Sequence, residues 1–516
     1  MKKIDQKEIL ILILCLFVGF ALRFYTFDRK SLWLDEIYTL GDSSDDLAGQ
    51  IKFYKENPTY FQAPLFFIIT HQFYPFAKPE RDLRLIPLLF GTLSIPMIYL
   101  LVRQFIPSAA LPCALSLTFM TYHIGLSQDG RSYTLLLFVG MTSLYFFIRH
   151  LNTSNKIYLI PVAFSFSILF YTSYSSILFI VVSQILWLYR PVGEVKKPSL
   201  SSFLILNGLS FLLCLPWLLF LAISYQSHSL MSLLEEESTT SFWHILYGVL
   251  NDWAPHAPLM IVSIILLILF PIFQKFRRNA FILLSTIVFP VVGVYLFCKL
   301  LNFSHFVTSR YFINFLPLFF ITLFLSLDAV ETKFEKLGRF FRMKFLFVLL
   351  LIASNLVILP IYYRSEKQDF RGLINYLTNH IRDGDKIIVS PKLYIHGILY
   401  YFGIGLSPNR DYLLSYQKIS ENETEYSISL IYRGNKFTIS HSKTYWNQYI
   451  AGGNRVWLVV DKKMAEEVKK VYPFSQKGYF DGSVLNLVRF PTDVSMYLLL
   501  FDPKFPGEKG IGALSE

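Results

Sequence analysis

Ser31-Leu32-Trp33-Leu34-Asp35-Glu36-Ile37-Tyr38 follows the first long apolar run of the chain. Two adjacent carboxylates therefore stand just beyond a segment that is long enough to enter a membrane. Trp33 and Tyr38 frame them, and such aromatic residues are enriched where a membrane meets water. The stretch predicts either a polar site at the membrane boundary or a solvated loop with an aromatic belt.

The composition excludes a soluble protein. Of the 516 residues, 53% are hydrophobic and 16% are charged, which is too apolar for a water-soluble chain of this length. The net charge of +12 could fit nucleic acid, but the basic residues stand in short clusters between apolar runs, as orientation determinants do. We therefore expect a polytopic α-helical membrane protein that binds membrane lipids and no nucleic acid.

The first apolar run and the four cysteines are both expected to belong to the membrane-embedded part. Ile9–Phe24 follows two lysines, as a signal peptide does, but no small-residue cleavage site follows it, and Arg23 and Tyr25 are typical of an interfacial anchor. We interpret it as an uncleaved helix. The cysteines lie inside apolar segments without metal-ligand spacing, which indicates small core residues: Cys15, Cys113, Cys214 and Cys298.

About eleven segments approach the roughly 20 apolar residues that a spanning helix needs. They are Ile9–Tyr25, Leu85–Val102, Ala109–Leu126, Tyr133–Ile148, Ile157–Tyr171, Ser175–Tyr189, Phe203–Ile223, Leu259–Phe273, Phe281–Leu301, Tyr311–Leu327 and Phe345–Tyr362. The run Pro64–Phe76 is shorter and is interrupted by His71 and Gln72. We expect this run to lie in the membrane interface rather than to span.

The placement of basic clusters supports this reading of Pro64–Phe76. If that run does not span, the clusters fall on one side of the membrane, which the positive-inside rule makes cytoplasmic. These clusters are Lys2-Lys3, Lys196-Lys197, Lys275 to Arg278 and Lys333 to Lys344. If the run did span, most of them would face outward. The acidic pair, in a first outer loop over residues 27–84 with interfacial helices, is therefore expected on the outer face.

The last part of the chain changes character. After a transmembrane domain of residues 1–362, charge, glycine and asparagine become more frequent and the apolar runs become shorter. Residues 363–516 are predicted to form a small α/β domain outside the membrane. Its expected elements are helices over Gln368–Arg382 and Met464–Val471, and strands over Lys386–Ser390 and Val456–Val460.

Polar residues at the outer ends of the expected helices form the candidate site. They are Asp35, Glu36, Gln62, His71 and Arg84 of the first outer loop, Gln128, Asp129, Arg131 and Tyr133 of the second, and His305, Arg310 and Tyr311 before the tenth helix. Carboxylates and guanidinium groups suit a reaction that deprotonates a hydroxyl and neutralises an anionic leaving group. Arginine is the better phosphate partner because its planar fork donates two parallel hydrogen bonds.

Any one of the three arginines could instead extend to lipid headgroups. However, Arg84, Arg131 and Arg310 all stand on the face that the positive-inside rule leaves poor in cations. Binding a lipid phosphate is one reason for this placement. The loop residues His244, Asp252 and His256, and Glu235 to Glu237, could line a path for an acceptor or be a solvated loop.

Four motifs stand in a recognisable order over roughly residues 10–150. They are Ser31-Leu32-Trp33-Leu34-Asp35-Glu36 after the first helix, Gln62-Ala63-Pro64-Leu65-Phe66 followed by His71, Arg84-Leu85-Ile86-Pro87-Leu88-Leu89-Phe90-Gly91, and Ser127-Gln128-Asp129-Gly130-Arg131-Ser132-Tyr133. This set resembles the protein mannosyltransferase and aminoarabinose transferase group, which are GT-C glycosyltransferases of the family 39 type. Such enzymes move a sugar from a polyprenyl-phosphate carrier to an acceptor at the outer membrane face and invert the anomeric centre.

The resemblance implies roles for individual residues. Asp35 matches the loop aspartate of the family, and Gln128 to Arg131 match its Gln-Glu-Ala-Arg segment. Two departures exist: Gln62-Ala63 stands where the family has His-Pro, and Asp129-Gly130 where it has Glu-Ala. The metal or acceptor role of the family's first histidine therefore does not carry over, and His71 is not its positional substitute.

The leading hypothesis is a glycosyltransferase of the bacterial cytoplasmic membrane and cell envelope. A lipid-linked donor also follows from topology, because no expected cytoplasmic loop is long enough for a nucleotide-binding domain. Asp35 is expected to act as general base or as its orienting partner, and Arg131, with Arg84 or Arg310, to stabilise the departing polyprenyl phosphate. Glu36 could bind a divalent cation or hydrogen-bond the loop, and we expect no obligatory metal because no second ligand stands at a recognisable spacing.

Two alternatives stay open. A transporter of lipid-linked sugars would need charges within its helices, and the expected helices carry theirs at the ends. A ligase or polymerase of lipid-linked glycans would share the outward site and the lipid phosphate. The donor sugar, and whether the acceptor is a glycolipid, glycan or protein, are not defined by the sequence.

Overall fold

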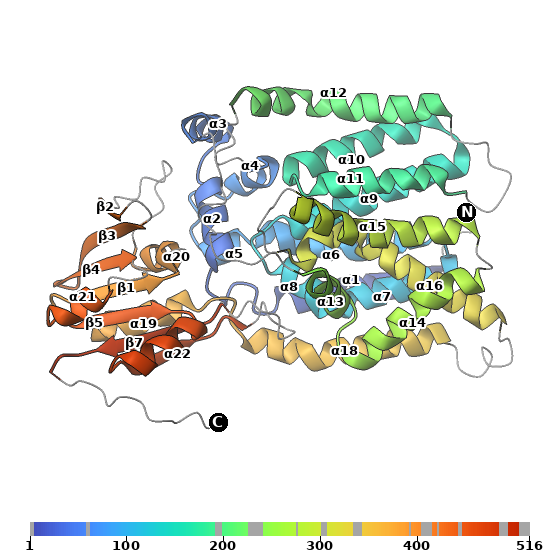
Figure 1. Cartoon of the computed structure of the whole chain (residues 1–516). Helices are drawn as coiled ribbons and strands as arrows, with labels where there is room; N and C mark the ends of the chain where they lie inside the picture. The colour runs from blue at the N-terminus through green and yellow to red at the C-terminus, as the bar shows by residue number, and fades with distance from the viewer. Residues whose placement is uncertain are drawn as a thin grey trace. The chain divides into compact units, whose positions relative to one another are not determined.

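The computed structural model of the chain (Figure 1) describes residues 5–57, 62–190, 199–224, 241–274, 277–300, 307–333, 343–391, 394–403, 415–420, 423–441, 446–483 and 494–504. The chain forms two compact units. The first comprises Met1–Phe27, Asp45–Ala77 and Arg81–Pro360, and the second comprises Asp28–Ser44, Lys78–Glu80 and Ile361–Glu516.

Every element that the structure describes within the first unit is a helix. The chain forms α1 (Gln6–Phe24), α3 (Leu47–Glu56), α4 (Leu65–His71), α5 (Pro79–Asp82), α6 (Leu85–Val102), η1 (Pro107–Ala109), α7 (Ala110–Phe119), α8 (Thr121–Ser127), α9 (Tyr133–Thr153), η2 (Lys156–Tyr158), α10 (Leu159–Thr172), α11 (Ser176–Ser183), η3 (Gln184–Leu188), α12 (Leu200–Ser224), α13 (Phe242–Trp253), α14 (Ala257–Phe273), α15 (Arg278–Leu300), η5 (Ser309–Phe315), α16 (Leu316–Lys333) and α18 (Met343–Arg364). Of these, α5 and α18 continue into residues of the second unit.

The protein is a polytopic α-helical membrane protein. Within the described residues, six helices are long and apolar enough to cross a bilayer, and counting two bent helix pairs, α7 with α8 and α13 with α14, raises the number to eight. All eleven expected segments contain helix, but fewer than eleven have the length and composition of a span. The reasons are local: α10 and α11 have 14 and 8 residues, and α1 carries charged residues near both ends.

The run Pro64–Phe76 contains only the short helix α4. Its seven residues extend over about 10 Å, whereas a bilayer core is roughly 30 Å thick. This length agrees with the expectation that the run does not span. The orientation that was derived from this run stays a prediction.

Close approach between helices in the first unit depends on small residues. A Cβ atom at Gly91 of α6 would lie 2.1 Å from the Ser127 hydroxyl oxygen and 3.4 Å from a methyl carbon of Thr134. Glycine therefore lets α6 pack against the end of α8 and the start of α9, where the second candidate motif lies. Cys15, Cys113 and Cys214 are free thiols buried in this unit, whereas the side chain of Cys298 lies outside the described residues.

The second unit is built on a mixed seven-stranded sheet in the order β2-β3-β4-β1-β5-β7-β6. The strands are β1 (Lys386–Ser390), β2 (Ser415–Ser420), β3 (Glu423–Tyr432), β4 (Asn435–His441), β5 (Val456–Val460), β6 (Ser475–Phe480) and β7 (Met496–Phe501), and the helices are α2 (Leu34–Ser43), α19 (Phe370–His380), α20 (Tyr394–Tyr401), α21 (Trp446–Ala451) and α22 (Lys462–Val471). The central strand β1 pairs in parallel with β4 and β5, and the remaining neighbours are antiparallel.

Elements expected in this unit are present where the periodicity was strong. The predicted helices correspond to α19 and α22, and the two predicted β-branched strands to β1 and β5. β5 is buried along its whole length, which explains its continuous apolar run. The strands β2, β3, β4 and β6 have mixed sequences, and pairing with neighbours rather than a local pattern places them in the sheet. The apolar strand β7 was not among the predicted elements.

The second unit also contains the acidic stretch from near the N-terminus. Asp28–Ser44 belongs to it, and α2 packs against α20. The sequence alone indicated no such association, because the two segments are separated by more than 300 residues and neither carries a signal for the other.

Candidate functional site

The backbone just before the acidic pair is held by side chains that follow α18. The Ser31 backbone N–H donates to the Glu366 carboxylate at 3.1 Å, and the Leu34 N–H donates to the side-chain oxygen of Gln368 at 2.9 Å. The Ser31 hydroxyl donates in turn to the Gln368 carbonyl. Ser31 and Gln368 are both buried, so these bonds form in a place with little competing water and fix the entry to α2.

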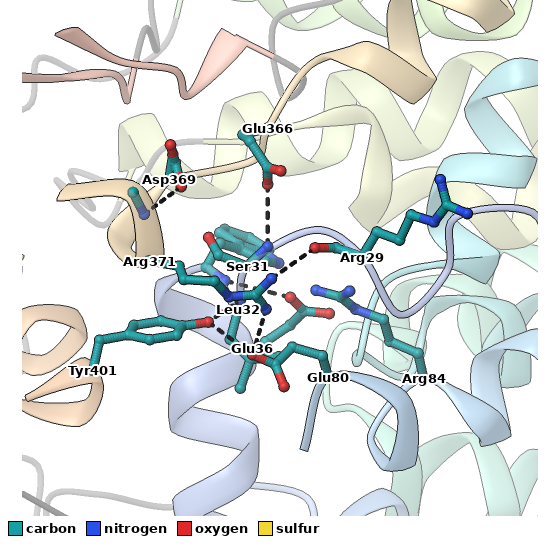
Figure 2. A network of polar contacts seen from close by, with 12 residues as sticks. Arg29, Ser31, Leu32, Glu36, Glu80, Arg84, Glu366, Asp369, Arg371 and Tyr401 are labelled. Atoms are coloured by element: carbon teal, nitrogen blue, oxygen red, sulfur yellow. Dashed lines mark hydrogen bonds and ion pairs between the residues drawn. The ribbon is translucent and has the colours of Figure 1, made fainter. Parts of the chain in front are cut away.

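A second set of bonds, drawn in Figure 2, involves Glu80 and two residues of the C-terminal sequence. The Tyr401 hydroxyl accepts the Leu32 N–H at 2.7 Å and donates to a Glu80 carboxylate oxygen at 3.2 Å. The same oxygen forms an ion pair with the Arg371 guanidinium at 2.6 Å. Arg371 also donates to the Arg29 carbonyl at 3.0 Å.

These bonds place Asp35 and Glu36 in the first turn of α2, after the N-cap residue Trp33. Negative charge at a helix N-terminus is stabilised by the helix dipole, by about 0.3–1 kcal/mol for an exposed group. The two carboxylates differ in exposure, since Glu36 is 0% exposed and accepts the Trp33 N–H at 3.4 Å, whereas Asp35 is half-buried. Asp35 is therefore the more exposed carboxylate of the pair.

Arg84 is a buried residue of the first unit. It precedes α6, has no exposed surface, and donates from one guanidinium nitrogen to the Phe27 carbonyl at 2.9 Å. A side chain with this burial does not extend into lipid headgroups. At least one of its donors helps to hold the chain that leaves α1.

The second motif is divided between structural and accessible residues. The Gln128 amide donates to the carbonyls of Arg23 and Tyr25 at 2.8 and 2.6 Å, so it ties the turn after α8 to the end of α1. Asp129 is also buried, and its carbonyl accepts the Arg131 N–H at 2.6 Å. The Arg131 side chain is half-buried.

Arg310 and Tyr133, two of the candidate residues, lie close together. The guanidinium carbon of Arg310 lies 5.4 Å from the centre of the Tyr133 ring, and its Nε donates to the Thr308 hydroxyl at 3.2 Å. Asp252 of α13 joins them, because it accepts the hydroxyl of Ser309 and interacts electrostatically with Arg310. From the sequence alone, Asp252 could either line a path for an acceptor or belong to a solvated loop.

The remaining candidates are less connected to these groups. The His71 ring stacks on Tyr74 with centroids 5.5 Å apart. Gln62 is exposed, and its carbonyl accepts the Tyr174 hydroxyl at 3.3 Å. Tyr311 is half-buried within η5. His244 and His256 are exposed, and His305 and Glu235 to Glu237 lie outside the described residues.

The described part of the chain contains no group of three or more His, Cys, Asp or Glu side chains that could hold a metal ion. Glu36, the candidate ligand, is instead engaged with the Trp33 backbone.

Comparison with known proteins identifies the fold. No protein-family model matches the sequence, and no curated protein sequence matches it. The crystal structure of apo ArnT from Cupriavidus metallidurans is similar at a TM-score of 0.51 and 10% identity, over 95% of this chain and 97% of that one. This protein has the GT-C fold. The similarity covers both compact units, and it confirms at the level of fold what the four motifs predicted.

Two further GT-C structures show weaker similarity. ArnT from Cupriavidus metallidurans bound to undecaprenyl phosphate has a TM-score of 0.48 at 10% identity, over 95% of this chain and 97% of that chain. The Archaeoglobus fulgidus oligosaccharyltransferase in complex with Zn and sulfate has a TM-score of 0.44 at 12% identity, over 75% of this chain and 61% of that chain.

Proposed function

We propose that this GT-C protein is a glycosyltransferase that takes a sugar from a polyprenyl-phosphate carrier and transfers it to an acceptor hydroxyl with inversion. The observation that carries the proposal is the half-buried Asp35 in the first turn of α2, in a chain with the GT-C fold over 95% of its length. ArnT, which shares this fold, has been crystallised with undecaprenyl phosphate. That ligand supports a donor of the same chemical class here.

Asp35 takes the role of general base. Its carboxylate removes the proton from the acceptor hydroxyl while the hydroxyl oxygen attacks the anomeric carbon of the donor. The bond from this carbon to the phosphate oxygen breaks, and polyprenyl phosphate leaves with the bonding electrons. A positioned base typically contributes about 10²–10⁴-fold to the rate.

The arginines of the first unit stabilise the charge of the departing phosphate. Arg131 is the leading candidate because its side chain is half-buried in a turn, and Arg310 is the second. Arg84 is buried against the Phe27 carbonyl, so we assign it to holding the site together rather than to the primary phosphate contact. Guanidinium groups suit this role because they keep their charge and donate in parallel pairs.

The proposed location follows from the basic clusters on the opposite side. With those clusters in the cytoplasm, Asp35 acts at the outer face of the cytoplasmic membrane. A donor that is already attached to a lipid is suited to that face, where nucleotide sugars are not made. The acceptor is a lipid, a glycan or a protein of the cell envelope.

The decisive experiment supplies the purified protein, in lipid nanodiscs, with a radiolabelled polyprenyl-phosphate monosaccharide. Membrane extracts divided into lipid, glycan and protein fractions serve as acceptors. We expect a new glycosidic product in one fraction and release of polyprenyl phosphate. Transfer of preassembled glycan chains instead of single sugars would identify a ligase or polymerase. Movement of the label across sealed vesicles without a new bond would identify a transporter and overturn the proposal.

A further inference from the structure

Arg371 connects two points of the chain that are far apart in sequence. One guanidinium nitrogen donates to the Arg29 carbonyl at 3.0 Å, and the other pairs with Glu80 at 2.6 Å. Arg29 precedes the acidic pair, and Glu80 lies in α5, later in the same first outer loop of residues 27–84. The Arg371 side chain therefore links the segment just before Asp35 to Glu80 (Figure 2).

Tyr401 reinforces the same closure from a second direction. Its hydroxyl acts as both acceptor and donor, since it accepts from the Leu32 N–H and donates to Glu80. Burial, and then the nearby Glu80 carboxylate, raise the pKa of Tyr401. The hydroxyl is therefore protonated near neutral pH and can donate to Glu80.

We propose that Glu80, Arg371 and Tyr401 form a clasp that positions Asp35 for the transfer reaction. Leu32 is three residues before Asp35, and its N–H together with those of Ser31 and Leu34 has a side-chain acceptor. These bonds set where α2 begins and so the direction in which its second residue points. The clasp touches no reacting atom, and its members are positioning residues. The kinetic part of this inference rests on the proposed function.

The clasp is expected to affect the chemical step rather than donor binding. A misplacement of a catalytic group by about 1 Å can cost roughly 10²-fold in rate. A buried polar group left without its partner shifts a local equilibrium by about ten- to a hundredfold. A clasp that only stabilised the fold would lower the melting temperature and the amount of active protein, without changing how each active molecule turns over.

The test compares the full-length wild type in nanodiscs with Tyr401→Phe, Glu80→Gln and their double variant. Matched controls are Tyr472→Phe and Glu466→Gln, which change the same residue types elsewhere in the second unit. Hydrogen exchange of peptides that cover residues 29–38 reports on the clasp without any substrate. Transfer assays, normalised to active protein, give kcat and the KM for the lipid-linked donor.

We expect Tyr401→Phe and Glu80→Gln to raise amide exchange over residues 29–38 by about tenfold and to lower kcat by about ten- to a hundredfold. The KM for the donor should stay at the wild-type value. The control variants should keep wild-type amide exchange, kcat and KM. Because both substitutions break one connected set of bonds, the double variant should lose little more than the worse single variant.

Unchanged exchange over residues 29–38 in both single variants overturns the clasp. Raised exchange with wild-type kcat overturns its positioning role. If the wild-type protein transfers no sugar, the proposed function fails together with the kinetic part of the inference. Exchange measured on the same samples then still decides whether the clasp holds this segment.

Discussion

The hydroxyl oxygen of Tyr401 lies 2.7 Å from the backbone nitrogen of Leu32, across 369 residues of sequence. This bond makes the acidic stretch, which follows the first helix, part of the same folded unit as the C-terminal sheet. The second unit therefore includes the segment that carries Asp35, the candidate base, and its C-terminal residues hold the backbone of that segment.

Asp35→Asn should abolish most transfer. The amide has nearly the same shape as the carboxylate but cannot accept the proton, so we expect kcat to fall by about 10²–10⁴-fold. Expression and melting temperature should change little, because loss of the charge removes only the helix-dipole contribution of about 0.3–1 kcal/mol. Asp28→Asn, in an exposed position of the same segment, is the control. Near-wild-type kcat in Asp35→Asn would remove this residue from the mechanism.

Glu36→Ala should act mainly on stability. The buried carboxylate accepts the Trp33 N–H, and loss of a helix-capping interaction typically costs about 0.5–2 kcal/mol. Glu36→Gln keeps an acceptor and should restore most of the loss, as measured by thermal unfolding in nanodiscs. If Glu36→Gln instead unfolded normally but had no transfer activity, Glu36 would have a direct chemical role.

Arg131→Gln should weaken use of the lipid-linked donor. Loss of one charge-assisted contact to a phosphate is expected to cost about 1.5–3 kcal/mol, which is seen as a lower kcat/KM for the donor. Arg310→Gln should have the same direction of effect. The control is Arg149→Gln, since Arg149 also lies over a tyrosine ring, at 5.2 Å from the centre of Tyr158 near the opposite end of α9. Equal losses in all three variants would argue against a specific phosphate site.

Removal of divalent cations should leave transfer intact. Preincubation with EDTA, followed by assay in metal-free buffer, is expected to give the wild-type rate, because the charge of the leaving phosphate is assigned to arginine side chains. Added Mg²⁺ or Zn²⁺ should not raise the rate further. Activity that disappears with EDTA and returns with one cation would contradict this assignment and would make Glu36 the first ligand to examine.

Asp385→Ala should destabilise the second unit. Asp385 is 1% exposed, and one of its oxygens accepts from Arg455 at 2.6 Å and from the Trp457 indole N–H at 2.8 Å. Removing one partner of a buried ion pair typically costs about 3–5 kcal/mol. Glu466→Ala, on the exposed side of α22, should change the melting temperature little. Similar melting temperatures for both variants would show that this buried pair adds no net stability.

Helix positions could be predicted from the sequence because hydrophobicity along a chain is a local property. Each expected apolar segment contains helix, and the periodic segments over Gln368–Arg382 and Met464–Val471 are helical as well. The number of spans follows less directly from the sequence, because within the described residues only six to eight helices have the length and composition of a span and breaks shorten others. Thr172 ends α10 and Gln184 begins a 3₁₀ turn after α11, and neither break changes the local composition.

Among the candidate residues too, some features could be predicted from the local sequence and others could not. Asp35 could be singled out from its place after the first helix and from the family resemblance. The different roles of Gln128, Arg131 and Arg84 could not, because burial and hydrogen-bond partners depend on distant residues. Gln128 is bound to carbonyls 105 and 103 residues earlier in the chain, and no spacing rule connects them.

The sequence by itself determined that the protein is a polytopic membrane protein, where most of its helices lie and that an acidic pair follows the first of them. These features depend on short-range hydrophobicity and periodicity. Only the tertiary structure decided that the backbone N–H groups of Ser31, Leu32 and Leu34 donate to Glu366, Tyr401 and Gln368, respectively. The physical reason is that backbone N–H groups have the same chemistry in every residue. Their choice of a partner more than 330 residues away is set by packing.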